Sequence, residues 1–152
     1  MGLIIDIVQA PFLRSHGIDV PMNVGQLVKM FYQELWNRWD DRAVDSVLAP
    51  GFRFRGSLGH ETVGITEWRA YRDLVRKGSS DFHNEIVGVV VEGDRAAARL
   101  IYSGTHDGPL AGVAATGRSF CYAGAAFFTS QGGLLTSAWV LGDLAGLREQ
   151  LE

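Results

Sequence analysis

The sequence predicts one α+β domain, a cone-shaped α+β barrel in which helices pack on a curved, mainly antiparallel sheet and enclose an apolar pocket. Apolar residues recur at helical spacing in the first half of the chain, whereas the second half is a succession of strand-like runs. The 19 glycines fall mostly between these runs, where short turns are expected. Helices followed by consecutive strands in one short chain are typical of helices laid on one face of a sheet.

The first half predicts helices with one short strand between them. A helix over residues 24–39 has an apolar face that contains Val24, Leu27, Val28, Phe31, Leu35 and Trp39. A shorter helix follows within residues 40–50 and ends at Pro50 and Gly51. Residues 52–57 read FRFRGS, with Phe52 and Phe54 on one face and Arg53 and Arg55 on the other, which indicates a short strand. A third helix is expected over residues 66–78, with Thr66 as its N-cap and Gly78 at its end.

The second half predicts four antiparallel strands and a closing helix. The strands span residues 81–94, 95–106, 118–130 and 134–143, and a loop over residues 106–117 separates the middle two. Asp143 ends the last strand, where it could serve as an acid in an active site or cap the helix over residues 144–152. We favour the cap, because an aspartate at this position can accept hydrogen bonds from the free N–H groups of the helix.

Composition and charge exclude several functional classes. The 14 basic and 17 acidic residues give a net charge of −3 without a basic cluster, so we expect no nucleic-acid partner. The chain has no apolar run of membrane-spanning length and no secretion signal, which predicts a cytoplasmic protein without a membrane partner. Its four histidines lack metal-ligand spacing, and it has no phosphate-binding loop, so we expect neither a metal nor a cofactor.

Four segments resemble the SnoaL-like polyketide cyclase family, also called ester cyclases, of the nuclear-transport-factor-two-like superfamily. The resemblance covers residues 22–151 and is carried by FYQELWNRWD, VDSVLAPGFRFRGS, GTHDGPLAGVAATGR and WVLGDLAGLREQL. It implies an α+β barrel over residues 22–152, preceded by an extension over residues 1–21. It also implies a small hydrophobic ligand, aromatic or polyketide-like, of the kind made in secondary metabolism such as antibiotic biosynthesis.

The final strand departs from the family at the position of the catalytic acid. Characterised cyclases of the family commonly carry a His-Trp-Asp-x-x-Asp pattern here, and its first aspartate is the general acid/base of an aldol-type ring closure. This chain has Ala138 at the histidine position and Val140 at that aspartate position, whereas Trp139 and Asp143 match. The resemblance therefore implies the fold and the pocket, but not the aldol mechanism.

Three other residues are candidates for acid–base chemistry. His106 and Tyr102 share the inward face of the strand over residues 95–106, and Tyr122 faces inward from the next strand. An imidazole beside a phenol can transfer protons or polarise an oxygen. A histidine that fixes the following loop through a backbone partner is an equally good interpretation of His106. The expected substrate-binding wall consists of Phe31, Trp36, Phe54, Trp68, Tyr71, Phe120 and Val140.

The strand over residues 118–130 also predicts a subunit interface. Its outward residues, Cys121, Ala123, Ala125 and Phe127, are small or apolar and ill suited to water, so we expect a homodimer that buries them. Two functions remain open from the sequence. One is a cofactor-free cyclase or isomerase acting on a small aromatic molecule through His106, Tyr102 and Tyr122. The alternative is a non-catalytic dimeric module that binds a small hydrophobic ligand, which the valine at position 140 favours.

Overall fold

The computed structural model describes residues 12–15 and 18–152. Two short strands, β1 (Phe12–Ser15) and β2 (Ile18–Pro21), pair with each other ahead of the main domain. The main sheet consists of β3 (Leu48–Arg55), β4 (Glu61–Val63), β5 (His83–Glu92), β6 (Arg95–Thr105), β7 (Ser119–Gln131) and β8 (Leu134–Gly142). Most of the predicted extension, residues 1–11 and 16–17, lies outside the described residues.

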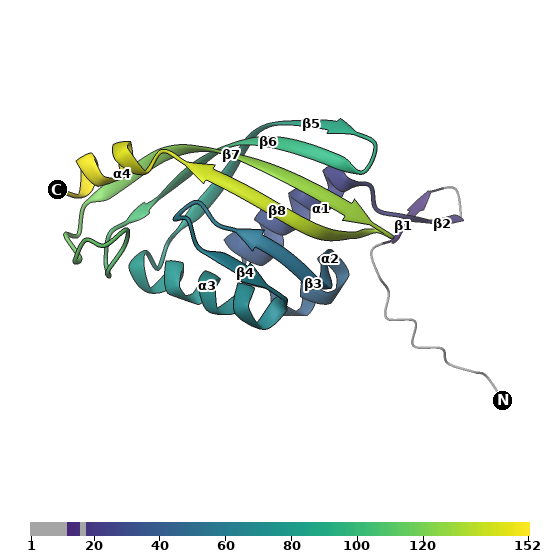
Figure 1. Ribbon diagram of the computed structural model, residues 1–152, viewed down its shortest axis with the longest axis horizontal. Helices are drawn as coiled ribbons and strands as arrows, with labels where there is room; N and C mark the ends of the chain where they lie inside the picture. Colours follow the sequence, from purple (N-terminus) through teal and green to yellow (C-terminus); the bar gives the residue numbers. More distant parts are fainter. Residues whose placement is uncertain (1–11, 16–17) are drawn as a thin grey trace.

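The main sheet has six strands in the order β4-β3-β8-β7-β6-β5. Only β3 and β8 run parallel, and every other neighbouring pair is antiparallel. Figure 1 shows the sheet curving over α1, α2 and α3, which lie on one side of it. The predicted α+β class and the mainly antiparallel sheet are confirmed. The edges β4 and β5 are not paired with each other, so the barrel is open.

The first helix differs from the prediction in its second half. Helix α1 (Val24–Met30) begins with a capping box between Asn23 and Gln26 and gives way to a π-helix, η1 (Phe31–Asn37). The wider π turn buries Phe31 and Tyr32 as well as Leu35 and Trp36. Trp39 lies beyond the helix in a left-handed conformation, with φ of 57°. The prediction that helix continues to Trp39 is therefore wrong.

Several predicted boundaries also move. A 3₁₀ turn, η2 (Asp41–Ala43), and α2 (Val44–Val47) replace the second helix, and β3 already begins at Leu48. Helix α3 (Ile65–Gly78) has Gly64 at its N-cap with φ of 85°, so the prediction of Thr66 as the cap is wrong. The predicted cap of α4 (Leu144–Leu151) is confirmed, because the Asp143 carboxylate accepts the N–H of Gly146 at 3.0 Å.

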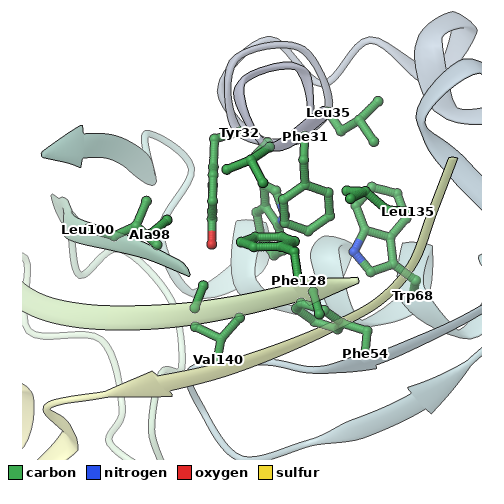
Figure 2. Close-up of a cluster of buried hydrophobic side chains, with 14 of the residues drawn as sticks. Phe31, Tyr32, Leu35, Phe54, Trp68, Ala98, Leu100, Phe128, Leu135 and Val140 are labelled. Atoms are coloured by element: carbon green, nitrogen blue, oxygen red, sulfur yellow. The ribbon is translucent and has the colours of Figure 1, made fainter. Parts of the chain in front are cut away.

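The core fills the space between the helices and the concave face of the sheet. Figure 2 shows Phe31 and Tyr32 reaching from the helix toward Phe128 and Val140 on the sheet. The rings of Phe31 and Phe128 meet edge to face, with their centroids 5.6 Å apart. Aromatic side chains therefore occupy most of the pocket that the curved sheet creates.

Strand β7 presents the two faces that its alternation predicts. Phe120, Tyr122, Ala126 and Phe128 are buried, whereas Cys121, Ala123 and Phe127 are exposed. The inward row therefore belongs to the core and the outward row lies on the surface of the sheet.

Candidate functional site

All four tyrosines of the chain gather inside the domain. Tyr32 comes from η1, Tyr71 from α3, Tyr102 from β6 and Tyr122 from β7, and each is at most 5% exposed. The rings of Tyr102 and Tyr122, which are directly paired across the two strands, lie 5.0 Å apart. Four phenols from four elements at the centre of an apolar core are a concentration of polar groups that packing alone does not require.

A small inner cavity lies beside these tyrosines. Its lining residues are Tyr32, Trp36, Phe54, Ser57, Val75, Phe82, Asn84, Tyr102 and Val140. Its volume, counted as the space that the centre of a water molecule can occupy, is only about 20 Å³, which is room for about one water molecule. A ligand larger than water can therefore enter only if some of the lining side chains move.

Three residues that line the inner cavity carry buried hydrogen-bond donors that form no well-oriented hydrogen bond with the described residues. They are the hydroxyl groups of Tyr32 and Tyr102 and the indole N–H of Trp36. The two hydroxyl groups lie close to each other, because each affects the pKa of the other. Figure 2 shows Tyr32 extending from the helix with its hydroxyl toward the sheet, on the side of Ala98 and Leu100. A buried donor without a partner costs free energy. A ligand oxygen in the inner cavity would offer such donors an acceptor.

Burial keeps these phenols in the neutral form. It raises the pKa of Tyr32, Tyr102 and Tyr122 far above the ordinary value of about 10, and the nearby tyrosines add to the effect on Tyr102. Burial also raises the pKa of Tyr71 to about 12, against the opposing effect of the hydrogen bond from the Leu58 N–H. At neutral pH the cluster therefore supplies hydrogen-bond donors and no bases.

No carboxylate is among the described residues that line the inner cavity. Val140 on β8 lines it, at the position where the resemblance to the family implies an aspartate. The polar residues of the wall besides the three donors are Ser57, whose hydroxyl bonds to Tyr122 at 3.0 Å, and Asn84. Asn84 is held by Asn37 at the end of the π-helix, since the Asn37 side chain bonds to both its N–H and its carbonyl oxygen. The chemistry of the cavity is thus hydrogen bonding by neutral groups.

Two glycines make room for the tyrosine rings. A Cβ atom on Gly124 of β7 would lie 2.4 Å from Cε2 of Tyr102, and one on Gly56 would lie 2.0 Å from the Tyr71 hydroxyl. Neither distance is possible in a real structure, so any larger residue would displace the ring. The small residues of the inward face of β7 therefore position Tyr102 against the cavity.

His106 lies away from the inner cavity and is fully buried. Its Nε2 is 3.1 Å from the carbonyl oxygen of Val113, and its Nδ1 accepts the N–H of Thr116 at 3.2 Å and contacts the Thr116 hydroxyl at 2.9 Å. With Nδ1 as an acceptor, Nε2 carries the proton and donates it to the carbonyl. Both ring nitrogens are therefore used to hold the loop over residues 106–118, the second of the two roles that the sequence left open.

The structure brings part of the predicted site together. Tyr102, Trp36, Phe54 and Val140 line the inner cavity. Tyr122 and Tyr71 lie behind it with their hydroxyls engaged by Ser57 and Leu58, respectively. Phe31, Trp68 and Phe120 are buried in the surrounding core and do not line the cavity.

Sequence reasoning missed Tyr32, Ser57, Val75, Phe82 and Asn84 as lining residues. Tyr32 was off the predicted apolar face, because that face assumed an α-helix and the π turn brings it inward. Asn84 alternates with two exposed residues, His83 and Glu85, so its inward direction could have been inferred from the strand pattern.

Two negative findings concern the described part of the chain. No group of three or more His, Cys, Asp or Glu side chains there could hold a metal ion. None of the helices described is both long and apolar enough to cross a membrane.

Comparison with known proteins identifies the family. The family model for SnoaL-like polyketide cyclases matches residues 26–151, and the chain belongs to this family. Membership of this family supports a cyclase- or isomerase-type function in general. No curated protein matches the sequence.

Solved structures agree with this assignment. TsrD from Streptomyces laurentii is 34% identical, with 84% of this chain and 93% of that chain covered and a TM-score of 0.74. A protein assigned as a SnoaL-like polyketide cyclase from Jannaschia sp. CCS1 is 22% identical, with 91% and 96% covered and a TM-score of 0.77. IdmH from Streptomyces antibioticus, assigned as a polyketide cyclase, is 21% identical, with 84% and 96% covered and a TM-score of 0.72. The last two show the shared fold.

Proposed function

We propose that this protein is a cofactor-free enzyme that binds the carbonyl oxygen of a small aromatic or polyketide-like ketone in the inner cavity and promotes its enolisation, as a cyclase or isomerase requires. The observation that carries the proposal is that three residues lining one cavity, Tyr32, Tyr102 and Trp36, each carry a buried donor without a well-oriented hydrogen-bond partner among the described residues. Donors fixed in a dry site stabilise negative charge that develops on an oxygen far better than water does.

The proposed chemistry requires no charged catalytic group on the wall. As the C–H bond next to the carbonyl breaks, its proton passes to water and the bonding electrons move onto the oxygen held by the donors. In a ring closure, the α carbon then forms a carbon–carbon bond to a second carbonyl carbon, whose oxygen takes up a proton. Neutral phenols suit this role, because each can donate a hydrogen bond to the ligand oxygen and still keep its own proton.

The test uses proton exchange, which does not depend on knowing the natural substrate. We expect the protein to accelerate exchange of the α protons of 2-tetralone for deuterium, followed by NMR. Removing one donor of this kind typically costs about 10²-fold to 10³-fold in rate, so Tyr102→Phe should lose most of the acceleration. Tyr71→Phe deletes a hydroxyl outside the cavity lining and should lose less. Exchange that is absent from the wild type, or equal in both variants, would contradict the proposal.

The alternative is a binding module without catalysis. None of the described residues that line the inner cavity is a carboxylate or a histidine, and this favours the alternative, because these residues supply no general base. A module of this kind would bind a planar ketone through the same donors and leave the rate of exchange unchanged. The exchange experiment therefore separates the two functions.

We also propose that the protein is a homodimer formed through the outer face of the sheet. Phe127, Trp139 and Leu141 are 52%, 44% and 51% exposed on neighbouring strands, and the rings of Phe127 and Trp139 lie 6.0 Å apart. Together with the outward row of β7, these residues form a contiguous apolar patch of the kind that marks protein interfaces.

A further inference from the structure

A second, larger pocket lies outside the inner cavity. Its volume, on the same measure as that of the inner cavity, is about 360 Å³. Its apolar wall includes Leu58, Leu74, Pro109 and Leu110. It lies where α3, α4 and the loop over residues 106–118 come together, at the end of the molecule that carries the C-terminus (Figure 1). We call it the outer pocket.

The charge of the outer pocket is opposite to that of the whole chain. The chain carries a net charge of −3. Among the described residues that line this pocket, the titratable side chains are those of His60 and Arg148, and none is a carboxylate. The guanidinium group of Arg148 makes no hydrogen bond or ion pair with the described residues. Its planar fork of donors is therefore available to an anion, and it matches a carboxylate in particular.

Neighbouring residues line the outer pocket and the inner cavity and form a wall between them. Ser57 and Leu58 are consecutive, and the first lines the inner cavity while the second lines the outer pocket. Val75 and Leu74 divide in the same way on α3. Tyr71 stands at this wall, with its ring 5.1 Å from that of Phe54 on the inner side and 5.9 Å from that of His60 on the outer side.

The loop side of the outer pocket is fixed before any ligand arrives. His106 holds the loop through Val113 and Thr116, and the N–H of Gly108 donates to the Gly78 carbonyl at the end of α3. Ala111, which lines the pocket, has φ of 51°, a left-handed conformation that residues other than glycine rarely adopt. Such strained residues occur most often at functional sites, where the surrounding structure holds them in place.

We propose that the outer pocket binds a carboxylate on the substrate through Arg148 and His60, which makes the substrate an aromatic acid that also carries a ketone. The carboxylate would lie against α4 and the aromatic body would contact the leucines. The carbonyl would reach the inner donors once side chains of the wall at Tyr71 move aside. That the substrate carries a ketone rests on the proposed function, whereas that it carries a carboxylate rests on the outer pocket alone.

The experiment compares two flat probes of similar shape, 2-naphthoate and its neutral counterpart 2-acetonaphthone, by calorimetric titration. We expect Arg148→Gln to weaken binding of 2-naphthoate about tenfold or more and to change binding of 2-acetonaphthone less than about twofold. Arg148→Lys should lie between, because lysine keeps the charge and loses the planar fork. Lys29→Gln on α1 removes one exposed positive charge away from both pockets and serves as the control.

Three results would overturn the inference. They are failure of 2-naphthoate to bind the wild-type protein, equal loss of both probes in Arg148→Gln, and an equal effect of Lys29→Gln. His60→Gln, at an exposed loop position, gives a second variant if Arg148→Gln melts at a lower temperature than the wild type. Failure of the proposed function is a different result, in which 2-naphthoate still depends on Arg148 but 2-tetralone shows no accelerated exchange.

Discussion

At the scale of single residues, the tyrosines determine the chemistry that the inner cavity can perform. A phenol in water ionises near pH 10, whereas burial raises the pKa of each of the four tyrosines. The site therefore keeps its donors over the whole physiological range. Val140 fits the same account, because a carboxylate beside the phenols would accept their hydrogen bonds and compete with a ligand oxygen.

Alkaline titration tests this view of the tyrosines. We expect no tyrosinate absorbance at pH about 10 while circular dichroism shows a folded protein, since all four pKa values are raised. Below that pH the four phenols are protonated in both the folded and the unfolded chain, so they do not change the free energy of unfolding. Above it the unfolded chain loses phenol protons that the folded chain keeps, so the free energy of unfolding falls as the pH rises. A tyrosine that titrates reversibly near pH 10 in the folded protein would show that it is not buried.

At the scale of elements, β7 holds the ring of Tyr102 in place beside the inner cavity. Gly124→Ala would place a methyl group 2.4 Å from the ring of Tyr102. We expect the ring to be displaced, with a loss of about 1–3 kcal/mol in the free energy of unfolding and a slower exchange of 2-tetralone. Thermal unfolding and the exchange assay measure the two effects.

Gly88→Ala on β5 is the matched control, because nothing lies within 4 Å of the added carbon. A Gly124→Ala protein as stable and as active as the wild type would mean that β7 does not position Tyr102.

The elements also show how far the sequence predicts the structure. Alternation along β7 and the cap at Asp143 could be inferred, because both depend on residues close together in the chain. The π-helix could not be inferred, since the apolar pattern of residues 24–39 also fits an α-helix. The inward direction of Tyr32 follows from the π-helix and was missed for the same reason. Strand β4 is only three residues long and depends on pairing with β3, which no local pattern reveals.

The candidate site was harder to predict than the fold for the same reason. Tyr102 and Tyr122 could be placed on one side of the sheet by counting along two strands. The direction of His106 could not, because it depends on hydrogen bonds to a loop seven to ten residues away. The outer pocket joins α3, α4 and this loop, and only the folded chain brings them together.

At the scale of the whole molecule, the exposed face of the sheet predicts the oligomeric state. We expect light scattering to give the mass of a dimer at micromolar concentration and that of a monomer for Ala125→Arg, because the variant would bury an unpaired charge in the interface. Ala70→Arg, on the exposed side of α3, adds the same charge elsewhere and should remain dimeric. A monomeric wild type, or a dimeric Ala125→Arg protein, would contradict the proposed interface.

The central claim is that Tyr32, Tyr102 and Trp36 together bind a carbonyl oxygen, and the most direct measurement is the carbonyl ¹³C chemical shift of labelled 2-tetralone bound to the protein. Strong hydrogen bonds to the oxygen polarise the carbonyl group and move its carbon resonance downfield. We predict a downfield shift on binding relative to the ketone in water, and a smaller one in Tyr102→Phe. A bound ketone whose resonance matches that in water, or whose shift is the same in Tyr102→Phe, would contradict the claim.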